Sequence, residues 1–172
     1  GMPLYVGGYT VGPPPLTKEP DPANLSRLVI LLTGFRPLSL SVGYKHQLVW
    51  GQTADGFGLY GMGKGENGRL GVEWFTGKDE TGIVNIDKAT WLPNSVTVKE
   101  VACGREHSLF LTSSSTVFSC GWGEAGRLGH GPEISELHTP KQVLTFQLLP
   151  SKLSSSEICP PIRSVAAGRE HS

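Results

Sequence analysis

The sequence predicts an all-β fold made of β-propeller blades, each a four-stranded antiparallel sheet, in an incomplete ring. Composition gives the first indication, because the 172 residues include 23 Gly and 13 Pro but only 17% charged residues. Such a composition favours turns and short strands over long helices. The second indication is a series of short apolar runs bounded by turn-forming residues. The third is a stretch that recurs at a spacing of roughly 60 residues, which fits a blade with insertions.

The recurrence is clearest around Gly104. The pentapeptide GREHS at 104–108 returns letter for letter at 168–172, and the looser copy GYKHQ occupies 43–47. A period of this length is too long for most helical repeats. The repeated unit is therefore expected to be a sheet.

A glycine-rich corner follows the second strand of each copy. GWGEAGRLG, which begins at Gly121, is matched with the run that begins at Gly61, with an insertion. Glycine adopts positive φ at little cost, so these residues predict sharp changes of direction. LYVGGY at 4–9 is a faint copy of residues 117–122.

Residues 1–37 are expected to contribute part of a blade. Strands are predicted at 4–9 and 28–32, and a proline-rich loop at 11–22 separates them. No helix runs through so many prolines.

Residues 38–99 form the first complete predicted repeat. One strand is predicted over 38–49, and a hairpin across Asp55-Gly56 leads into a second strand over 57–62. The connector 72–99 then includes a strand-like run at 83–86.

Residues 100–163 form the second predicted repeat, and 164–172 begin a further one. A strand is predicted over 101–111, Ser113–Ser115 form a turn, and a second strand covers 117–120. The connector 130–163 closes the repeat. Residues 1–172 are expected to form a single propeller-type domain.

These residues resemble the repeats of the regulator of chromosome condensation family. The family pattern reads roughly V-A-x-G-x-x-H-S/T, then L-x-L-T, a turn, V-Y/F-x-x-G-x-G/N and G-x-L-G-x-G. Residues 101–131 follow it nearly throughout, and residues 40–71 follow it in part. TPKQV at 139–143 resembles the family's step into an outer strand, which 146–149 extends. The resemblance covers about 100 of the 172 residues.

The sequence departs from the family pattern at two places. Ser113–Ser115 replaces the Asp-Gly or Asn-Gly turn that the family usually has, and Arg69 and Arg127 stand where the family most often has Gln. Neither difference alters the predicted fold.

The resemblance implies a seven-bladed ring, of which this chain holds about two repeats and parts of others. Propellers close with at least about four blades, so we expect that the chain does not close alone. We therefore expect a fragment or short form of a longer propeller, or self-association through open blade edges, since unpaired edges attract other strands.

Three histidines occupy one register of the repeat and invite a catalytic or metal-binding interpretation. Residues that recur in register are expected to be structural, so we interpret them as inward, hydrogen-bonded side chains that tie neighbouring blades together. Three histidines on three blades would also lie too far apart for one metal ion. The structural repeat positions are His46, His107, His171, Gly43, Gly104, Gly121 and Gly168.

Two further patterns have a structural and a functional interpretation. The glycines at 121–126 and 63–68 match a dinucleotide-binding fingerprint, but they lack the helix and the βαβ unit that such a site needs. Arg105-Glu106 and Arg169-Glu170 would face opposite sides of a strand. We expect an Arg of one blade to pair with a Glu of the next, and the alternative is a charged rim that binds a partner.

Trp74, Phe75 and Trp91 are the candidate partner-binding residues. They lie in a connector, and exposed aromatic residues in loops often anchor partners. Packing between blades is the alternative for these side chains.

Charge and cysteine content narrow the function classes. The 15 basic and 15 acidic residues cancel, so we expect no direct nucleic-acid binding. Cys103, Cys120 and Cys159 give neither a zinc spacing nor an even disulfide set, and reduced thiols suit a cytoplasmic or nuclear protein. No apolar run approaches the ~18 residues of a membrane span, so no membrane association is expected. We predict no catalytic residue, no cofactor and no metal ion.

The sequence therefore predicts a non-enzymatic protein-interaction module that presents its connectors, 72–99 and 130–163, on one face. The family resemblance implies two alternatives. One is a guanine-nucleotide exchange factor, in which a propeller face grips a small GTPase and loosens its nucleotide and magnesium. The other is a chromatin-associated adaptor, which would need a basic tail or patch that this sequence lacks. No position here can be matched to the family's exchange residues.

Overall fold

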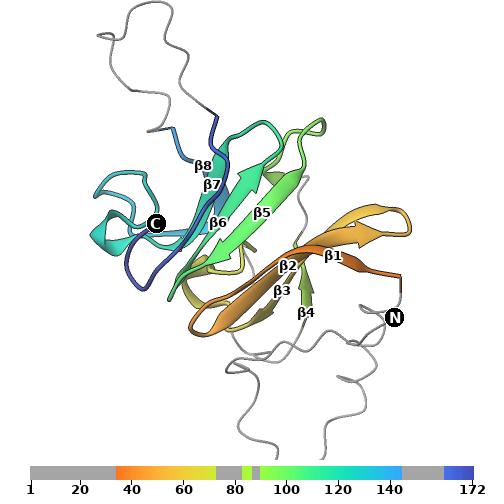
Figure 1. Cartoon of the computed structure of the whole chain (residues 1–172). Coiled ribbons are helices and arrows are strands. Elements are labelled where there is room, and N and C mark those ends of the chain that lie inside the picture. The colour runs from red at the N-terminus through yellow and green to blue at the C-terminus, as the bar shows by residue number, and fades with distance from the viewer. Residues whose placement is uncertain (1–33, 73–82, 87–89, 145–160) are drawn as a thin grey trace, which may run out of the picture.

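A computed structural model describes residues 34–72, 83–86, 90–144 and 161–172 (Figure 1). The strands predicted at 4–9, 28–32 and 146–149 lie outside these residues, as does the proline-rich loop. In the part of the chain that is described, no helix has the length and apolar character needed to cross a bilayer.

The described residues form two four-stranded antiparallel sheets, in which strands that follow one another in sequence pair with one another (Figure 1). The predicted all-β fold with four-stranded blades is therefore confirmed, and two sheets leave the ring incomplete. The first sheet consists of β1 (Arg36–Val42), β2 (His46–Thr53), β3 (Gly56–Gly63) and β4 (Ile83–Asn85). The second consists of β5 (Val98–Cys103), β6 (His107–Thr112), β7 (Val117–Trp122) and β8 (Glu136–Gln142).

Two of the predicted strands are each a pair of strands. The predictions of single strands at 38–49 and 101–111 are wrong, because the chain turns between β1 and β2 and again between β5 and β6. Both turns are closed by the same hydrogen bond, from Gly43 N to His46 O at 2.8 Å and from Gly104 N to His107 O at 2.9 Å. The turns are so short that the apolar runs on either side read as one run.

The register of the sheets corrects the alignment of the glycine-rich corners. His46 lies opposite Gly63, and His107 lies opposite Gly121, so Gly121 corresponds to Gly63 rather than to Gly61. The two corners then need no insertion, and each contains a 3-10 turn, η1 (Glu66–Gly68) or η3 (Glu124–Gly126). A turn this short is not the helix that a dinucleotide-binding fingerprint requires.

The inner strands of the two sheets lie beside each other. The backbone N–H groups of Val101 and Cys103 in β5 donate to the hydroxyls of Ser39 and Ser41 in β1, at 3.1 and 2.8 Å. These side chains satisfy amides that an edge strand would leave unpaired. On the other side of β5, the Ser164 hydroxyl donates to the Glu100 carboxylate at 2.9 Å. The segment 161–168 therefore continues the same arrangement.

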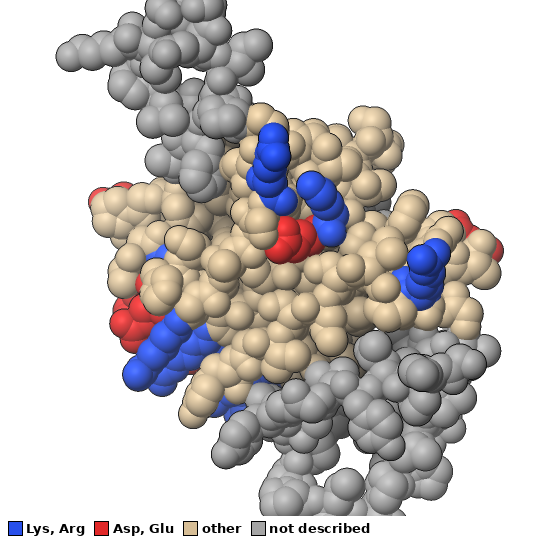
Figure 2. Space-filling view, viewed as in Figure 1, with Lys and Arg blue, Asp and Glu red and all other residues tan. Residues whose placement is uncertain are grey.

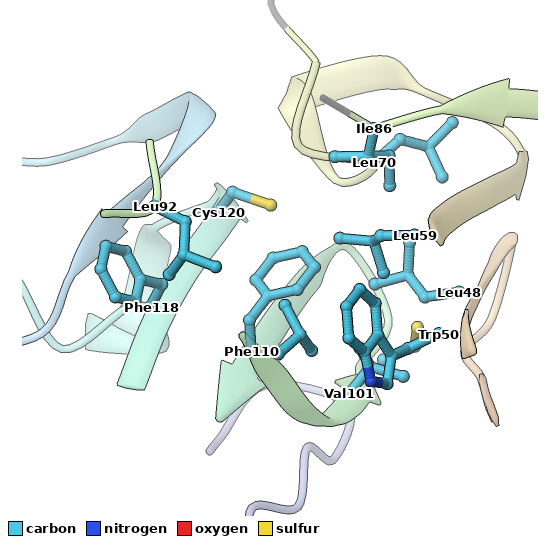
Figure 3. Close-up of a cluster of buried hydrophobic side chains, with 12 residues drawn as sticks. Leu48, Trp50, Leu59, Leu70, Ile86, Leu92, Val101, Phe110, Phe118 and Cys120 are labelled. Carbon is cyan, nitrogen blue, oxygen red and sulfur yellow. The ribbon is translucent and has the colours of Figure 1, made fainter. Parts of the chain in front are cut away.

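One apolar core joins the two sheets. Figure 3 shows Leu48, Trp50 and Leu59 of the first sheet facing Val101 and Phe110 of the second, and each of these side chains is at most 4% exposed. Burying a large apolar side chain contributes roughly 1.5–3 kcal/mol. The interface between the sheets is therefore part of the fold rather than a contact between separate domains.

Candidate protein-interaction surface

Three turns of the pattern Gly-x-x-His lie at equivalent places in successive repeats, at 43–46, 104–107 and 168–171. Glycine is required at Gly104 because a Cβ there would overlap the ring of His107 and would lie 2.6 Å from the carbonyl oxygen of Gly168. Without a side chain, neighbouring turns approach closely enough for Tyr44 N to donate to Gly104 O at 3.2 Å. The glycines thus set the spacing of the turns.

The histidines of the first two turns each contact the following repeat. His46 Nε2 lies 2.8 Å from Ser108 Oγ, and His107 Nε2 lies 2.9 Å from Ser172 Oγ. The two serine hydroxyls donate their protons to backbone carbonyl oxygens, Ser108 to Arg69 and Ser172 to Arg127, both at 2.7 Å. Each hydroxyl therefore accepts a hydrogen bond from the Nε2–H group of a histidine. In a neutral ring this places the proton on Nε2 and leaves Nδ1 unprotonated.

Burial keeps these two histidines neutral. His46 is 1% exposed and His107 is fully buried. Burial, together with the nearby cations Arg69 and Arg127, lowers the pKa of His46 to about 3 and that of His107 to about 4. Side chains so enclosed do not reach a substrate. His171 is exposed.

Two buried arginines, at the positions where the sequence differs from the family pattern, brace the glycine-rich corners. Arg69 Nε donates to Glu66 O at 2.8 Å, and Arg127 Nε donates to Glu124 O at 2.6 Å. The Arg69 guanidinium is 1% exposed and also lies 3.5 Å from the Glu66 carboxylate and 3.8 Å from that of Glu106. These arginines are thus enclosed by the fold.

The two middle positions of each of the three turns make up a set of residues that we call the turn rim. Tyr44 is 60% exposed, and the side chains of Arg105 and Arg169 are 35% and 72% exposed. In Figure 2, basic and acidic side chains gather at the lower left, where Figure 1 shows the C-terminal segment passing the lower end of β5. The turn rim consists of Tyr44, Lys45, Arg105, Glu106, Arg169 and Glu170.

Contacts along the turn rim cross from each repeat to the next. The Arg105 guanidinium carbon lies 5.6 Å from the centre of the Tyr44 ring, and its Nη1 lies 3.9 Å from the Glu170 carboxylate. The prediction that Arg105 and Glu106 lie within a strand is wrong, because both are turn residues. The Arg105–Glu170 ion pair is nevertheless a pairing of an Arg in one repeat with a Glu in the next.

A concavity of about 490 Å³ lies between the three turns. The turn glycines, Val42, Cys103 and Ala167 contribute its lining, and Tyr44, Arg105 and Arg169 stand around it. Burial raises the pKa of the Cys103 thiol to about 12, so this wall presents a neutral thiol rather than a thiolate. The site offers an aromatic ring, cations and backbone groups, but no activated nucleophile.

The candidate aromatic residues lie elsewhere. Trp91 is half-buried, and its ring packs on the second sheet, 5.1 Å from the ring of Phe110 and 5.2 Å from that of Phe118. Trp74 and Phe75 lie outside the described residues, so partner binding by these aromatic residues remains a prediction. Among the residues that the structure describes, no three His, Cys, Asp or Glu side chains group as metal ligands would.

The sequence indicated four residues of the turn rim, because Arg105-Glu106 and Arg169-Glu170 recur letter for letter and have a charged rim as one interpretation. It did not indicate Tyr44, which shares the position of Arg105 and Arg169 but not their chemistry. The signal that could have found Tyr44 is the repeat itself. Between the recurring glycine and histidine of each turn, the position after the glycine is the one that reaches solvent.

Comparisons with known proteins also identify repeats in this chain. A family model described as the regulator of chromosome condensation (RCC1) repeat matches residues 58–111 and 114–172. A human protein named RCC1-like G exchanging factor-like protein is 34% identical over 96 residues, which cover 56% of this chain and 20% of that protein.

Two solved structures are also similar. Human WBSCR16 is 30% identical with a TM-score of 0.52, over 63% of this chain and 26% of that one. Prp20p from Saccharomyces cerevisiae is 20% identical with a TM-score of 0.55, over 79% of this chain and 30% of that one. The chain thus spans less than a third of the length of each of these relatives.

Proposed function

The chain belongs to the family of regulator of chromosome condensation (RCC1) repeat proteins, and we propose that it is a non-enzymatic protein-interaction module whose binding surface is the turn rim. One observation carries this proposal. In the first two turns, the recurring glycine and histidine make contacts that hold the repeats together. The position after each turn glycine reaches solvent instead, because Tyr44 is 60% exposed and the side chains of Arg105 and Arg169 are 35% and 72% exposed. This division suits a scaffold whose turns present side chains to a partner.

The chemistry of the turn rim fits a protein partner. Tyr and Arg are the residue types that most often dominate binding energy at protein interfaces, and both are exposed here. Acidic Glu106 and Glu170 alternate with the cations, which opposes a nucleic-acid backbone. The concavity between the turns provides space for a protruding partner side chain. The buried free thiols of Cys103 and Cys120 suit a site of action in the cytoplasm or nucleus.

Site-specific photo-crosslinking tests the proposal. The photoreactive residue p-benzoylphenylalanine is placed at Tyr44, which is 60% exposed, and in a matched control at Leu144, which is 51% exposed and outside the turn rim. Crosslinking in cells is expected to give discrete protein adducts from position 44 that position 144 does not give. Identical adducts from both positions, or none from position 44, would contradict the proposal.

Guanine-nucleotide exchange on a small GTPase is the second candidate function. It is favoured by the human relative named RCC1-like G exchanging factor-like protein, at 34% identity. Release of a fluorescent GDP analogue from a panel of small GTPases separates the two functions. Accelerated release that Arg105→Ala abolishes would support exchange, and binding without acceleration would support the interaction module alone.

A further inference from the structure

The turn rim carries an excess of positive charge. Its cations are Lys45, Arg105 and Arg169, and its acidic residues are Glu106 and Glu170. The Glu106 side chain is only 13% exposed and already lies 3.8 Å from the buried Arg69 guanidinium. Glu170 is therefore the one acid of the turn rim whose side chain is largely exposed, at 55%. Three cations against this one exposed carboxylate leave a net charge of +2.

The two arginines of the turn rim share that carboxylate. Oε1 of Glu170 lies 3.9 Å from Nη1 of Arg105 and 3.7 Å from Nε of Arg169. Both distances are longer than the roughly 2.8 Å of a charge-assisted hydrogen bond, and a guanidinium can bind a carboxylate through two such bonds. Glu170 thus shows where an acid would lie and leaves both arginines with the capacity to bind another one.

Tyr44 and the concavity between the turns favour a peptide over a small anion. Lys45 Nζ lies 5.4 Å and the Arg105 guanidinium carbon 5.6 Å from the centre of the Tyr44 ring, so the ring lies among the cations. The neighbouring concavity has apolar side chains in its lining, those of Val42 and Ala167 among them. A small anion would contact the arginines alone. A peptide that combines acidic and apolar residues would contact the arginines, the ring and the lining.

We propose that the turn rim binds an acidic segment of a partner protein, which places carboxylates on Arg105 and Arg169 and an apolar side chain in the concavity. This inference rests on the proposed function and specifies the chemistry of the partner. Because the segment would replace Glu170 at the two arginines, Glu170 is a competitor within the chain. A nucleic acid fits less well, since Glu170 repels its phosphates and it has no apolar side chain for the concavity.

The probe is a fluorescent peptide of sequence Asp-Glu-Leu-Asp-Glu with blocked termini, titrated with the full chain and followed by anisotropy. Saturable binding is expected with one peptide per chain. The control peptide Asn-Gln-Leu-Asn-Gln has nearly the same shape without the charges, and it should bind at least about fivefold more weakly. Absence of saturable binding by the acidic peptide, equal binding by both peptides, or equally tight binding of an oligothymidylate of the same charge would overturn the proposal.

Three variants of the chain locate the binding. Arg169→Glu should weaken binding of the acidic peptide about tenfold, because it replaces an attraction with a repulsion. Glu170→Gln removes the internal competitor and should tighten binding about threefold. Arg36→Glu makes the same charge change at an exposed position at the other end of β1, and it should leave the affinity within about twofold of the wild type. Unchanged affinity in Arg169→Glu, or weaker binding in Glu170→Gln, would contradict the proposal.

The combined outcomes separate this inference from the proposed function. If crosslinking from position 44 gives discrete protein adducts but the acidic peptide does not bind, the turn rim binds a partner of another chemistry and only this inference fails. If neither adducts nor peptide binding are observed, the assignment of the turn rim as a binding surface fails as well.

Discussion

His46 Nε2 lies 2.8 Å from the hydroxyl of Ser108, a residue 62 positions further along the chain and in the other sheet. The same hydroxyl donates to the backbone carbonyl of Arg69, so one serine satisfies two buried groups of the preceding repeat. The contact recurs between His107 and Ser172, at 2.9 Å. Repeats of this chain are therefore linked by polar contacts as well as by their apolar core.

Replacement of Ser108 by Ala should destabilise the fold strongly. The change leaves the His46 Nε2–H without a partner in a buried site, and it leaves the Arg69 carbonyl with only the weak Cys120 thiol donor at 3.8 Å. A buried unsatisfied group costs about 1–3 kcal/mol. We expect the free energy of unfolding in urea to fall by about 2–4 kcal/mol. Ser172→Ala is the matched control, because Ser172 is exposed and water can replace its hydroxyl, so it should lose less than about 1 kcal/mol. Equal losses in the two variants would contradict this account.

Stability should decrease on acidification. The pKa values of His46 and His107, about 3 and about 4, lie below the value of about 6.5 for an unfolded histidine. Between these values the unfolded chain binds more protons than the native chain, so the stabilisation is complete above about pH 6.5 and is lost as the pH falls. At pH 5 the loss amounts to about 2 kcal/mol for each histidine.

The measurement is urea unfolding as a function of pH. His107→Gln should reduce the pH dependence between pH 7 and 5, because it removes one of the two buried neutral histidines. If the His107→Gln profile kept the slope of the wild type, the buried neutral histidine would not be its source.

Replacement by alanine should destabilise the fold more at Gly104 than at Gly126. At Gly104 a Cβ would overlap the His107 ring, which is itself enclosed, so Gly104→Ala should lower the free energy of unfolding by about 3 kcal/mol. At Gly126 a Cβ would meet nothing within 4 Å beyond its chain neighbours, and only the φ of +73° opposes alanine. Gly126→Ala should therefore lose about 1 kcal/mol. Thermal melting ranks the pair, and the reverse order would refute the role of close approach at Gly104.

One substitution should stabilise the chain. Ala125 has a φ of 60°, which is unfavourable for a residue with a Cβ, and its counterpart Asn67 has a φ of 59°. Ala125→Gly should raise the free energy of unfolding by up to about 1 kcal/mol. Asn67→Gly should change it little, because Asn tolerates this conformation. A destabilising Ala125→Gly would show that the turn does not hold Ala125 in this conformation in solution.

The fold was predictable because its determinants recur. The Gly-x-x-His copies and the Asp55-Gly56 hairpin indicated four-stranded blades, and TPKQV at 139–143 indicated the outer strand that the structure contains as β8. The turns at Gly43 and Gly104 were missed because two apolar runs separated by only a few residues read as one strand. The register of Gly121 was missed because the spacing of glycines alone allows either Gly61 or Gly63, and only the strand opposite selects one.

The candidate binding surface was less predictable. Ser108 and Ser172 gain their role from residues in the preceding repeat, and no local pattern reveals such a contact. Arg69 would ordinarily be assigned to the surface, but its guanidinium is 1% exposed and paired with Glu66 and Glu106. The turn rim arises because three distant turns come together, which depends on the packing of the sheets rather than on any one segment.

Crosslinking at position 44 first identifies a partner protein. The most direct test of the turn rim is then to measure how tightly this partner binds the double variant Tyr44→Ala, Arg105→Ala. Tyr44 is exposed and Arg105 is partly exposed, and contacts of such surface side chains contribute at most about 1 kcal/mol to stability. We predict that partner affinity falls at least tenfold while the melting temperature stays within a few degrees of the wild type. Unchanged affinity in a variant that melts normally would contradict the assignment of partner binding to the turn rim.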